Sequence, residues 1–127
     1  MLFIDYLTLI HSGQFYGGNS HLQVTEISKS LKVMAKDFDC PVICLAQLNR
    51  SVESRANKRP MMSDIRESGS VEQDADVIMF LYREAYYDKE AQNQTLEIII
   101  SKNRNGPVAT IHVNYNEHTG RIEDHKE

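Results

Sequence analysis

The sequence contains no tryptophan, only two cysteines, and few of the glycines and prolines that mark fibrous chains. Cys40 and Cys44 cannot make a disulfide framework, so we expect two reduced thiols in a cytosolic protein. No apolar stretch reaches about 18 residues, so no transmembrane helix and no membrane partner are expected. The apolar first ten residues lack a basic region and are interrupted by Asp5, so we expect no signal peptide.

What remains is the composition of one globular domain. The 127 residues are 41% hydrophobic and 25% charged, which is too apolar for a disordered chain. The net charge of −4 argues mildly against a nucleic-acid-binding protein. The charge is unevenly distributed, however. Residues 49–66 carry five basic and two acidic side chains, and residues 84–97 carry four acidic and one basic. This asymmetry favours a local anion-binding site over a generally basic surface.

Several catalytic motifs are missing from the sequence. It has no G-x-x-x-x-G-K-[ST] phosphate-binding loop and no G-x-S-x-G nucleophile elbow. The five histidines lack the spacing of metal ligands and the cysteines have no second pair, so we expect no zinc site. An ATPase interpretation of this sequence therefore lacks its phosphate cradle.

The apolar periodicity predicts an α/β chain with a mostly parallel sheet and a C-terminal antiparallel hairpin. A stripe of apolar residues at helical spacing predicts a helix over residues 21–38: Val24, Ile27, Leu31, Met34 and Phe38. Apolar strands at 2–10 and 42–46 flank this helix, and that order predicts parallel strands with a right-handed crossover. The remaining expectations for the first half are a glycine-rich loop at 11–20 and a polar, basic segment at 48–63 that forms a long loop or a short helix. For the second half we expect a short helix at 70–74, a strand at 76–82, a hairpin of 95–101 and 108–115 around Asn105-Gly106, and a polar tail at 116–127 that frays.

Polar side chains follow the first two predicted strands. Asp5 ends the apolar run LFI, and Gln47 follows the run VICLA. Ligands of open α/β sheets bind at the carboxyl ends of strands, where an aspartate can hold Mg²⁺ and an amide can contact a γ-phosphate. The alternatives are an Asp5 carboxylate that accepts from a nearby backbone N–H, and a Gln47 that only begins an exposed loop.

The segment DIRESGSVEQDAD, residues 64–76, combines small residues with one arginine. Gly69 can bring backbone N–H groups close to an anion, and Arg66 offers a fork for phosphate. Such a loop suits a nucleic-acid backbone, although the acidic residues at the end of the segment would repel phosphate on the same face. The alternative is a Ser-Gly turn in which Ser70 caps a short helix.

The sequence KNRNGP places two cations beside the predicted hairpin turn. Lys102 and Arg104 are two residues apart, so they share a side if the strand continues. Two cations at a strand end can stabilise phosphoryl charge, including charge at a site on a neighbouring subunit. The alternative is a basic hairpin tip that only keeps the protein in solution.

Three stretches, in this order, resemble the C-terminal half of the RecA-like motor domain of DnaB-type replicative DNA helicases: FIDYLTLI, LAQLNRSVESRANKRPMMSDIRESGSVEQDADVIMFLYR and KNRNGP. The resemblance covers nearly the whole chain except the loop after Ile10 and the last dozen residues. It implies a partial RecA-like P-loop NTPase core over residues 1–115, followed by the polar tail at 116–127. It further implies a cytoplasmic protein of a bacterium or phage, in which ATP binds between the subunits of a hexameric ring.

The resemblance implies a role in ATP hydrolysis for four residues. Asp5 matches the Walker B aspartate that holds Mg²⁺ beside ATP. Gln47 matches the glutamine that couples the γ-phosphate to the DNA-binding loops. Lys102 and Arg104 match the pair that reaches into the neighbouring subunit's ATP site, where Arg104 would be the arginine finger.

The resemblance also implies the binding partners of the parent protein, by which we mean the intact helicase that would contain this chain. Arg66, Glu67 and Gly69 match the loop that touches the backbone of single-stranded DNA in the central channel of a homohexameric ring. A helicase loader and a primase are the further partners that the family implies. Contacts to phosphate and sugar carry no sequence information, so we expect no base-specific readout.

The family's P-loop lysine and Ser/Thr, and the glutamate that activates the attacking water, match no part of this sequence. We therefore predict that the chain alone does not hydrolyse ATP, and that it is marginally stable or self-associates. One alternative is a non-catalytic binding module that keeps the helicase surface for a loader, an inhibitor or a ring subunit. A RecA-like recombination protein is a third interpretation, and the block SDIRESGSVEQDAD argues against it.

Overall fold

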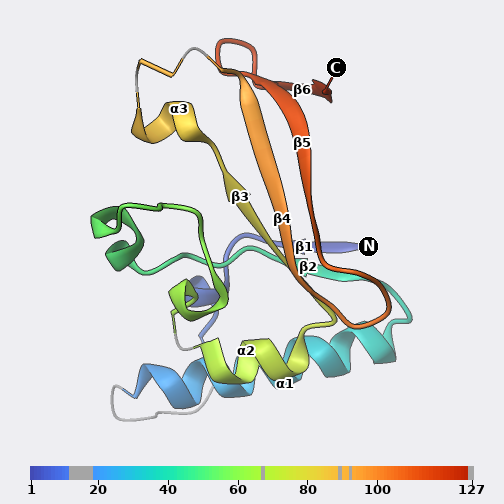
Figure 1. Cartoon of the computed structure of the whole chain (residues 1–127). Helices are drawn as coiled ribbons and strands as arrows, with labels where there is room; N and C mark the ends of the chain where they lie inside the picture. Colours follow the sequence, from blue (N-terminus) through green and yellow to red (C-terminus); the bar gives the residue numbers. More distant parts are fainter. Residues whose placement is uncertain (12–18, 67, 89, 92, 126–127) are drawn as a thin grey trace. The chain divides into compact units, whose positions relative to one another are not determined.

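The computed structural model of the chain describes residues 1–11, 19–66, 68–88, 90–91 and 93–125 (Figure 1). Most of the predicted glycine-rich loop at 11–20, and Glu67, lie outside the described residues. The chain divides into two compact units, of which unit 1 is Met1–Lys58 with Met62–Ala75 and unit 2 is Arg59–Met61 with Asp76–Glu127. Along the chain the helices and strands are β1 (Leu2–Ile4), 3-10 helix η1 (Leu7–Leu9), α1 (Ser20–Asp37), β2 (Val42–Cys44), 3-10 helices η2 (Arg50–Ser54) and η3 (Met62–Asp64), α2 (Ser68–Asp74), β3 (Val77–Tyr82), α3 (Glu84–Tyr87), β4 (Thr95–Asn103), β5 (Ala109–Asn116) and β6 (Arg121–Asp124).

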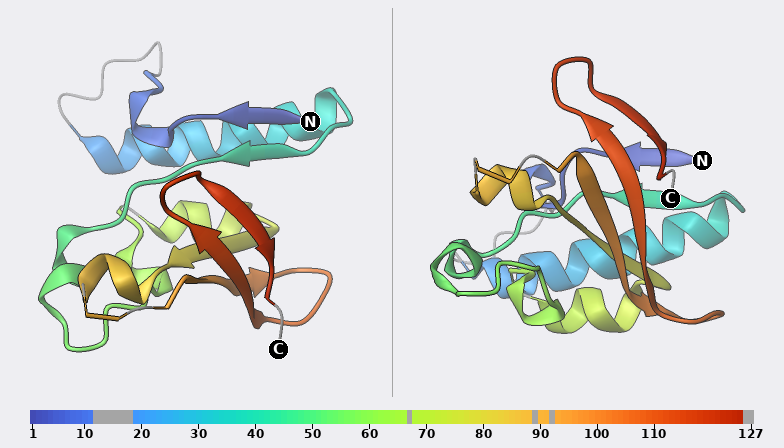
Figure 2. Two further views of the ribbon diagram at one scale, coloured as in Figure 1. Left: turned by 90° about the horizontal axis from the view of Figure 1, so that it is seen from above. Right: turned by 45° about the horizontal axis from the view of Figure 1, so that its top comes forward.

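Two short parallel strands and a long crossover helix form the frame of unit 1. β1 pairs with β2 in parallel, with Ile4 opposite Cys44, and α1 connects them (Figure 2). The predicted strand–helix–strand order is confirmed. The predicted strand at 2–10 is too long, because the chain turns into η1, where the N–H of Leu9 donates to the carbonyl of Tyr6 at 3.0 Å.

α1 is buried along only part of its predicted apolar face. The helix begins where the Asn19 side chain accepts from the N–H of Leu22 at 3.3 Å, which satisfies one free amide of its first turn. Val24 and Ile27 are buried with Leu7 of η1, whereas Phe38 at the far end is 72% exposed. No helix in the described part of the chain is long and apolar enough to cross a membrane.

α2 lies beside the N-terminal half of α1 and is joined to it by side-chain hydrogen bonds (Figure 1). The hydroxyl of Ser28 donates to a carboxylate oxygen of Asp74 at 2.8 Å. The hydroxyl of Thr25 donates to that of Ser70 at 3.2 Å. These bonds fix α2 next to the buried half of α1, which explains why that half of the apolar face is covered.

Unit 2 is a four-stranded antiparallel sheet in the order β3-β4-β5-β6. The expectation of a mostly parallel sheet is wrong, because only β1 and β2 pair in parallel among the described strands. The predicted hairpin is confirmed as β4 and β5, with Ile98 opposite Ile111. The 116–127 segment, expected to fray, instead contributes β6, where Ile122 lies opposite Tyr115 of β5.

β3 alternates strictly between buried and exposed side chains. Ile78, Phe80 and Tyr82 are buried, whereas Met79 and Leu81 are 53% and 65% exposed. The run VIMFLY is apolar on both faces, a pattern typical of a strand that is buried on both faces. In the described chain one of these two faces stays open to solvent.

Candidate functional site

Asp5 and Gln47 lie at the same edge of the parallel strand pair. Asp5 directly follows β1, and Gln47 lies three residues beyond β2. Backbone pairing continues past both strands, since the N–H of Leu45 donates to Ile4 at 2.9 Å and the N–H of Leu7 donates to Leu45 at 2.8 Å. Both polar side chains are exposed. The backbone therefore presents them at the carboxyl end of the sheet, where α/β proteins bind their ligands.

A single carboxylate at this edge limits the kind of metal site that can form. The described residues contain no group of three or more His, Cys, Asp or Glu that would hold a metal ion. Mg²⁺ is commonly bound by one or two carboxylates together with waters and substrate phosphates, and it does not need an all-protein cage. The exposed Asp5 carboxylate fits that requirement as one ligand of a magnesium ion brought with a nucleotide.

A backbone bridge connects the Gln47 segment to the Arg66 segment. Leu48 and Ile65 form an isolated antiparallel β-bridge, and the N–H of Asn49 donates to the carbonyl of Asp64 at 2.7 Å. In antiparallel register the residues that flank a bridged pair face one another along the two chains. Gln47 is thereby placed opposite Arg66, so the structure brings together two residues that the sequence analysis considered separately.

Arg66 and Gly69 are both exposed, but Gly69 lies in a helix and not in a loop. Gly69 is the second residue of α2, and a Cβ added there would have nothing within 4 Å. Packing therefore does not require glycine at this position, and open space lies in front of the backbone. The alternative in which Ser70 caps the helix is also wrong, because α2 begins at Ser68.

Lys102 and Arg104 lie at the end of β4, in unit 2. Lys102 is in the strand opposite Ile78, and Arg104 follows the last strand residue. The N–H of Arg104 donates to the carbonyl of Asp76 at 2.8 Å, and its guanidinium Nε lies 3.4 Å from the Asp76 carboxylate. Asp76, which looked unfavourable for anion binding, is therefore paired with the candidate finger.

The turn that follows Arg104 is held by the side chain of Asn103. Its amide donates to the carbonyl of Pro107 at 3.3 Å, and its oxygen accepts from the N–H of Asn105 at 3.4 Å. A Cβ added at Gly106 would lie 2.7 Å from that amide nitrogen. Glycine at position 106 thus leaves room for the Asn103 side chain in the turn that begins after Arg104.

Sequence reasoning missed a buried ion pair within the basic segment of unit 1. Arg55 donates from both terminal nitrogens to the two carboxylate oxygens of Asp64, at 2.9 and 2.8 Å. The Asp64 residue is only 3% exposed. Asp64 had been considered only as the start of the 64–76 segment, and no sequence spacing marks two residues that meet across an irregular loop.

A second arginine–carboxylate pair, in unit 2, was also missed. Arg59 donates to both carboxylate oxygens of Glu97, at 2.9 and 2.6 Å, and its guanidinium lies 4.6 Å from the ring centre of Tyr82. Hydrogen bonding to Arg59 holds the pKa of the Glu97 carboxyl below its ordinary value, and the charge on His112 acts in the same direction. This pair fixes residues 59–61 on the sheet.

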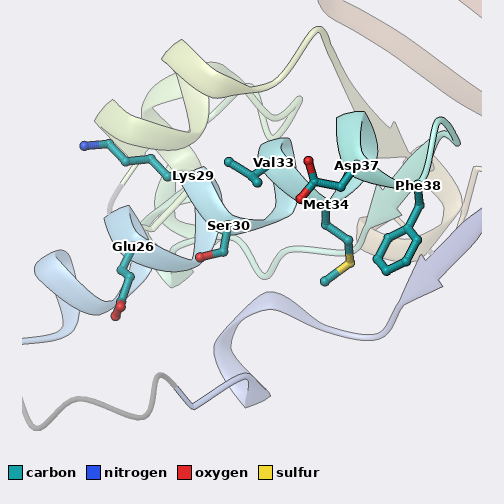
Figure 3. Close-up of a pocket in the computed structure, with 7 residues that line it drawn as sticks. All are labelled: Glu26, Lys29, Ser30, Val33, Met34, Asp37 and Phe38. Carbon is teal, nitrogen blue, oxygen red and sulfur yellow. The ribbon is translucent and has the colours of Figure 1, made fainter.

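A shallow hollow on α1 contains none of the candidate residues. It has a volume of about 420 Å³, and its lining side chains come from α1 and the residue that follows it (Figure 3). The lining residues are Glu26, Lys29, Ser30, Val33, Met34, Asp37 and Phe38. The hollow exists because the apolar end of α1 is uncovered, and it is separate from the β1–β2 edge.

The exposed Asp5 and Gln47 thus lie at the carboxyl end of paired parallel strands, which is where open α/β sheets bind ligands such as nucleotides. The family model of the DnaB-like helicase C terminal domain matches residues 1–124. The chain belongs to this family.

Relatives with curated names are replicative helicases. The chain is 57% identical over 112 residues to the replicative DNA helicase DnaB of Geobacillus stearothermophilus, an alignment that covers 87% of this chain and 25% of that protein. It is 48% identical over 128 residues to the replicative DNA helicase DnaB of Buchnera aphidicola subsp. Baizongia pistaciae, which covers 100% of this chain and 27% of that protein. The chain spans about a quarter of the length of these curated relatives.

Solved structures agree with the family assignment. A DnaB-like replicative helicase, described with its interactions with primase, superposes with a TM-score of 0.91 at 46% identity, covering 98% of this chain and 30% of that one. A separately solved ATPase domain superposes with the same score and identity over 98% of this chain and 44% of that one. The fold is therefore that of a segment of a DnaB-like ATPase domain.

Proposed function

We propose that the chain is part of a hexameric replicative DNA helicase, which couples ATP hydrolysis to movement along single-stranded DNA and to duplex unwinding. The observation that carries the proposal is the Leu48–Ile65 bridge, because it sets Gln47, at the strand edge, opposite Arg66. The residue proposed to contact the γ-phosphate is thus connected to a residue proposed to contact DNA by a short stretch of paired backbone.

Four residues serve ATP in this proposal. Asp5 is a ligand of Mg²⁺, which when bound neutralises charge on the phosphates of ATP. Gln47 contacts the γ-phosphate end and responds to its state. Lys102 and Arg104 extend from the end of β4 into the ATP site of the neighbouring subunit, where Arg104 stabilises the charge that develops on the transferred phosphoryl group.

Three residues contact DNA in this proposal, and the helicase that contains this chain also binds protein partners. Arg66, Glu67 and Gly69 contact the sugar–phosphate backbone of single-stranded DNA, and the open space in front of Gly69 allows that approach. Other copies of the parent protein complete a homohexameric ring, and a loader and a primase bind the assembly. Because the contacts go to phosphates, binding weakens as salt rises and depends little on base sequence.

The 127-residue chain alone does not hydrolyse ATP in this proposal, because its sequence contains no G-x-x-x-x-G-K-[ST] loop. DNA-stimulated ATP turnover by the pure chain, abolished by Asp5→Asn, would contradict this part of the proposal.

The test of the main function uses a chimera in which this chain replaces the matching segment of the replicative helicase DnaB of Buchnera aphidicola subsp. Baizongia pistaciae, because that alignment covers the whole chain. We expect the chimera to hydrolyse ATP in response to single-stranded DNA and to separate a forked duplex. Asp5→Asn should lower the turnover number by about a hundredfold, because a metal ligand is lost. Asp37→Asn, at the exposed end of α1, is the matched control and should leave turnover unchanged.

Two results would overturn the proposed function. One is a hexameric chimera that binds ATP but neither responds to DNA nor unwinds it. The other is equal turnover in the Asp5→Asn and Asp37→Asn variants, which would show that Asp5 holds no catalytic metal.

A further inference from the structure

The ion pair of Arg55 and Asp64 holds a carboxylate that is buried. Asp64 is a buried acidic side chain, and its partner Arg55 keeps a side-chain exposure of 30%. Arg55 also donates from Nε to the carbonyl of Asn57 at 3.3 Å, so its fork is held from two directions. Removing the arginine from a buried ion pair is strongly unfavourable, so the folded chain should keep this contact closed.

The ion pair lies next to the backbone bridge that connects the candidate ATP-binding residue Gln47 to the candidate DNA-binding residue Arg66. Asp64 accepts the N–H of Asn49 through its own backbone carbonyl, and its neighbour Ile65 bridges to Leu48. The same residue thus anchors a side-chain fork and the backbone that sets Gln47 opposite Arg66. A change in the Arg55–Asp64 contact should therefore first disturb the pairing that sets Gln47 opposite Arg66.

We propose that Arg55 and Asp64 are positioning residues, which hold Gln47 and Arg66 in register so that DNA bound at Arg66 changes ATP turnover at the Gln47 side. The inference rests on the proposed function. Neither residue touches the nucleotide or the DNA in this proposal. They act through the backbone between Leu48–Asn49 and Asp64–Ile65.

The geometry of the fork decides which substitutions test the idea. Arginine offers two parallel donors to a carboxylate, whereas lysine offers one mobile charge. Arg55→Lys keeps the charge beside Asp64 and loses the fork, and it is milder than Arg55→Met, which removes the positive charge from the buried carboxylate altogether. Arg50→Met, in the exposed first turn of η2, removes an arginine of the same segment and is the matched control.

The first measurement is amide hydrogen exchange at Asn49 in the 127-residue chain. We expect Arg55→Lys to reduce the protection of this N–H by about tenfold relative to Arg50→Met, because its acceptor is no longer held. Protection that is equal in the two variants would overturn the proposal, whatever the chain does in a helicase.

The second measurement uses the chimera and compares ATP turnover with and without single-stranded DNA. A positioning role predicts that Arg55→Lys and Arg55→Met lower the stimulation by DNA by about tenfold, while turnover without DNA and hexamer formation stay within twofold of Arg50→Met. Loss of turnover to the same extent with and without DNA would show a merely structural role and overturn the proposal. If the unsubstituted chimera ignores DNA, the proposed function itself fails, and the exchange result alone decides whether the pair sets the local register.

Discussion

At the scale of single residues, burial separates three arginine–carboxylate pairs that have the same chemistry. Asp64 is buried, and Glu97 is largely covered, so Arg55 and Arg59 hold structure together. The Arg104 and Asp76 side chains are half exposed, and their charged atoms are 3.4 Å apart. A pair of that kind contributes about 0–1 kcal/mol, so Arg104 can leave Asp76 for a phosphate at little cost.

Substitution of Arg104 should therefore affect catalysis without affecting stability. In the chimera, Arg104→Gln should lower DNA-stimulated turnover by about a thousandfold, the range found for arginine fingers, because a cation at the phosphoryl group is lost. The free energy of unfolding should stay within about 0.5 kcal/mol. Arg121→Gln, which removes an exposed arginine paired with Glu123 in β6, is the control and should change neither quantity. Equal turnover in both variants would favour a hairpin tip that only aids solubility.

The Arg59–Glu97 pair predicts a pH dependence of stability. The pKa of Glu97 is lowered in the folded chain, so its carboxylate stabilises the fold above the ordinary carboxyl value of 4.5. That stabilisation is lost as the pH falls through the lowered folded-state pKa. The difference in unfolding free energy between the chain and Glu97→Gln should be largest near neutral pH and shrink below about pH 4.5. Urea titrations over this range measure it, with Glu123→Gln as the exposed control; a difference that is constant with pH would contradict the assignment.

The sequence predicted the positions of some functional residues and missed others, for a physical reason. Asp5 and Gln47 follow apolar runs whose order implies neighbouring strands, so their shared edge could be predicted. The Arg55–Asp64 pair could not, because its partners meet across an irregular loop that has no repeating period. The roles of Asp5, Gln47, Arg66, Glu67, Gly69, Lys102 and Arg104 in catalysis and DNA binding stay predictions.

At the scale of elements, periodicity was reliable where it was long. The helix predicted at 21–38 is α1 at Ser20–Asp37, because its apolar stripe repeats over several turns. β6 was missed because Arg121–Asp124 is exposed throughout and has no run of apolar residues that would mark a strand. A signal was nevertheless present in the preceding turn. Gly120 has φ +69°, and the Asn116 side chain accepts from the N–H groups of His118 and Thr119.

Two glycines in these elements should respond to alanine in opposite directions. Gly69 lies in α2 with free space around its Cβ position, so Gly69→Ala should stabilise the chain by up to about 1 kcal/mol. Gly120 has a positive φ, so Gly120→Ala should destabilise it by about 1 kcal/mol. Chemical denaturation of both variants measures these effects.

The same pair of variants separates fold from function. If the backbone at Gly69 approaches DNA, the added methyl group in the chimera should weaken single-stranded DNA binding by about tenfold even though the chain is more stable. Gly120→Ala is the control and should leave DNA affinity unchanged. A Gly69→Ala chimera that binds DNA as tightly as the parent would show that DNA does not approach this backbone.

At the scale of the whole chain, the fold was misjudged where apolar residues lie on both faces of a strand. Such a strand normally sits inside a parallel sheet with cover on both sides. Here β3 pairs with β4 in an antiparallel sheet, and Met79 and Leu81 stay exposed on one face with Ile111 of β5. Among the described residues, this face is therefore left partly open to solvent.

The exposed β3 face should make the isolated chain self-associate. Sedimentation should show a mass that rises with concentration, and the melting temperature should depend on concentration, because apolar surface is buried between copies. Met79→Lys with Leu81→Lys should restore a monomer, since more than half of each residue is exposed and little packing is lost. Thr110→Lys with Asn105→Lys adds the same charge at exposed positions off this face, so it should leave the association unchanged. If the unsubstituted 127-residue chain stays monomeric at high concentration and its melting temperature does not depend on concentration, this face does not mediate self-association.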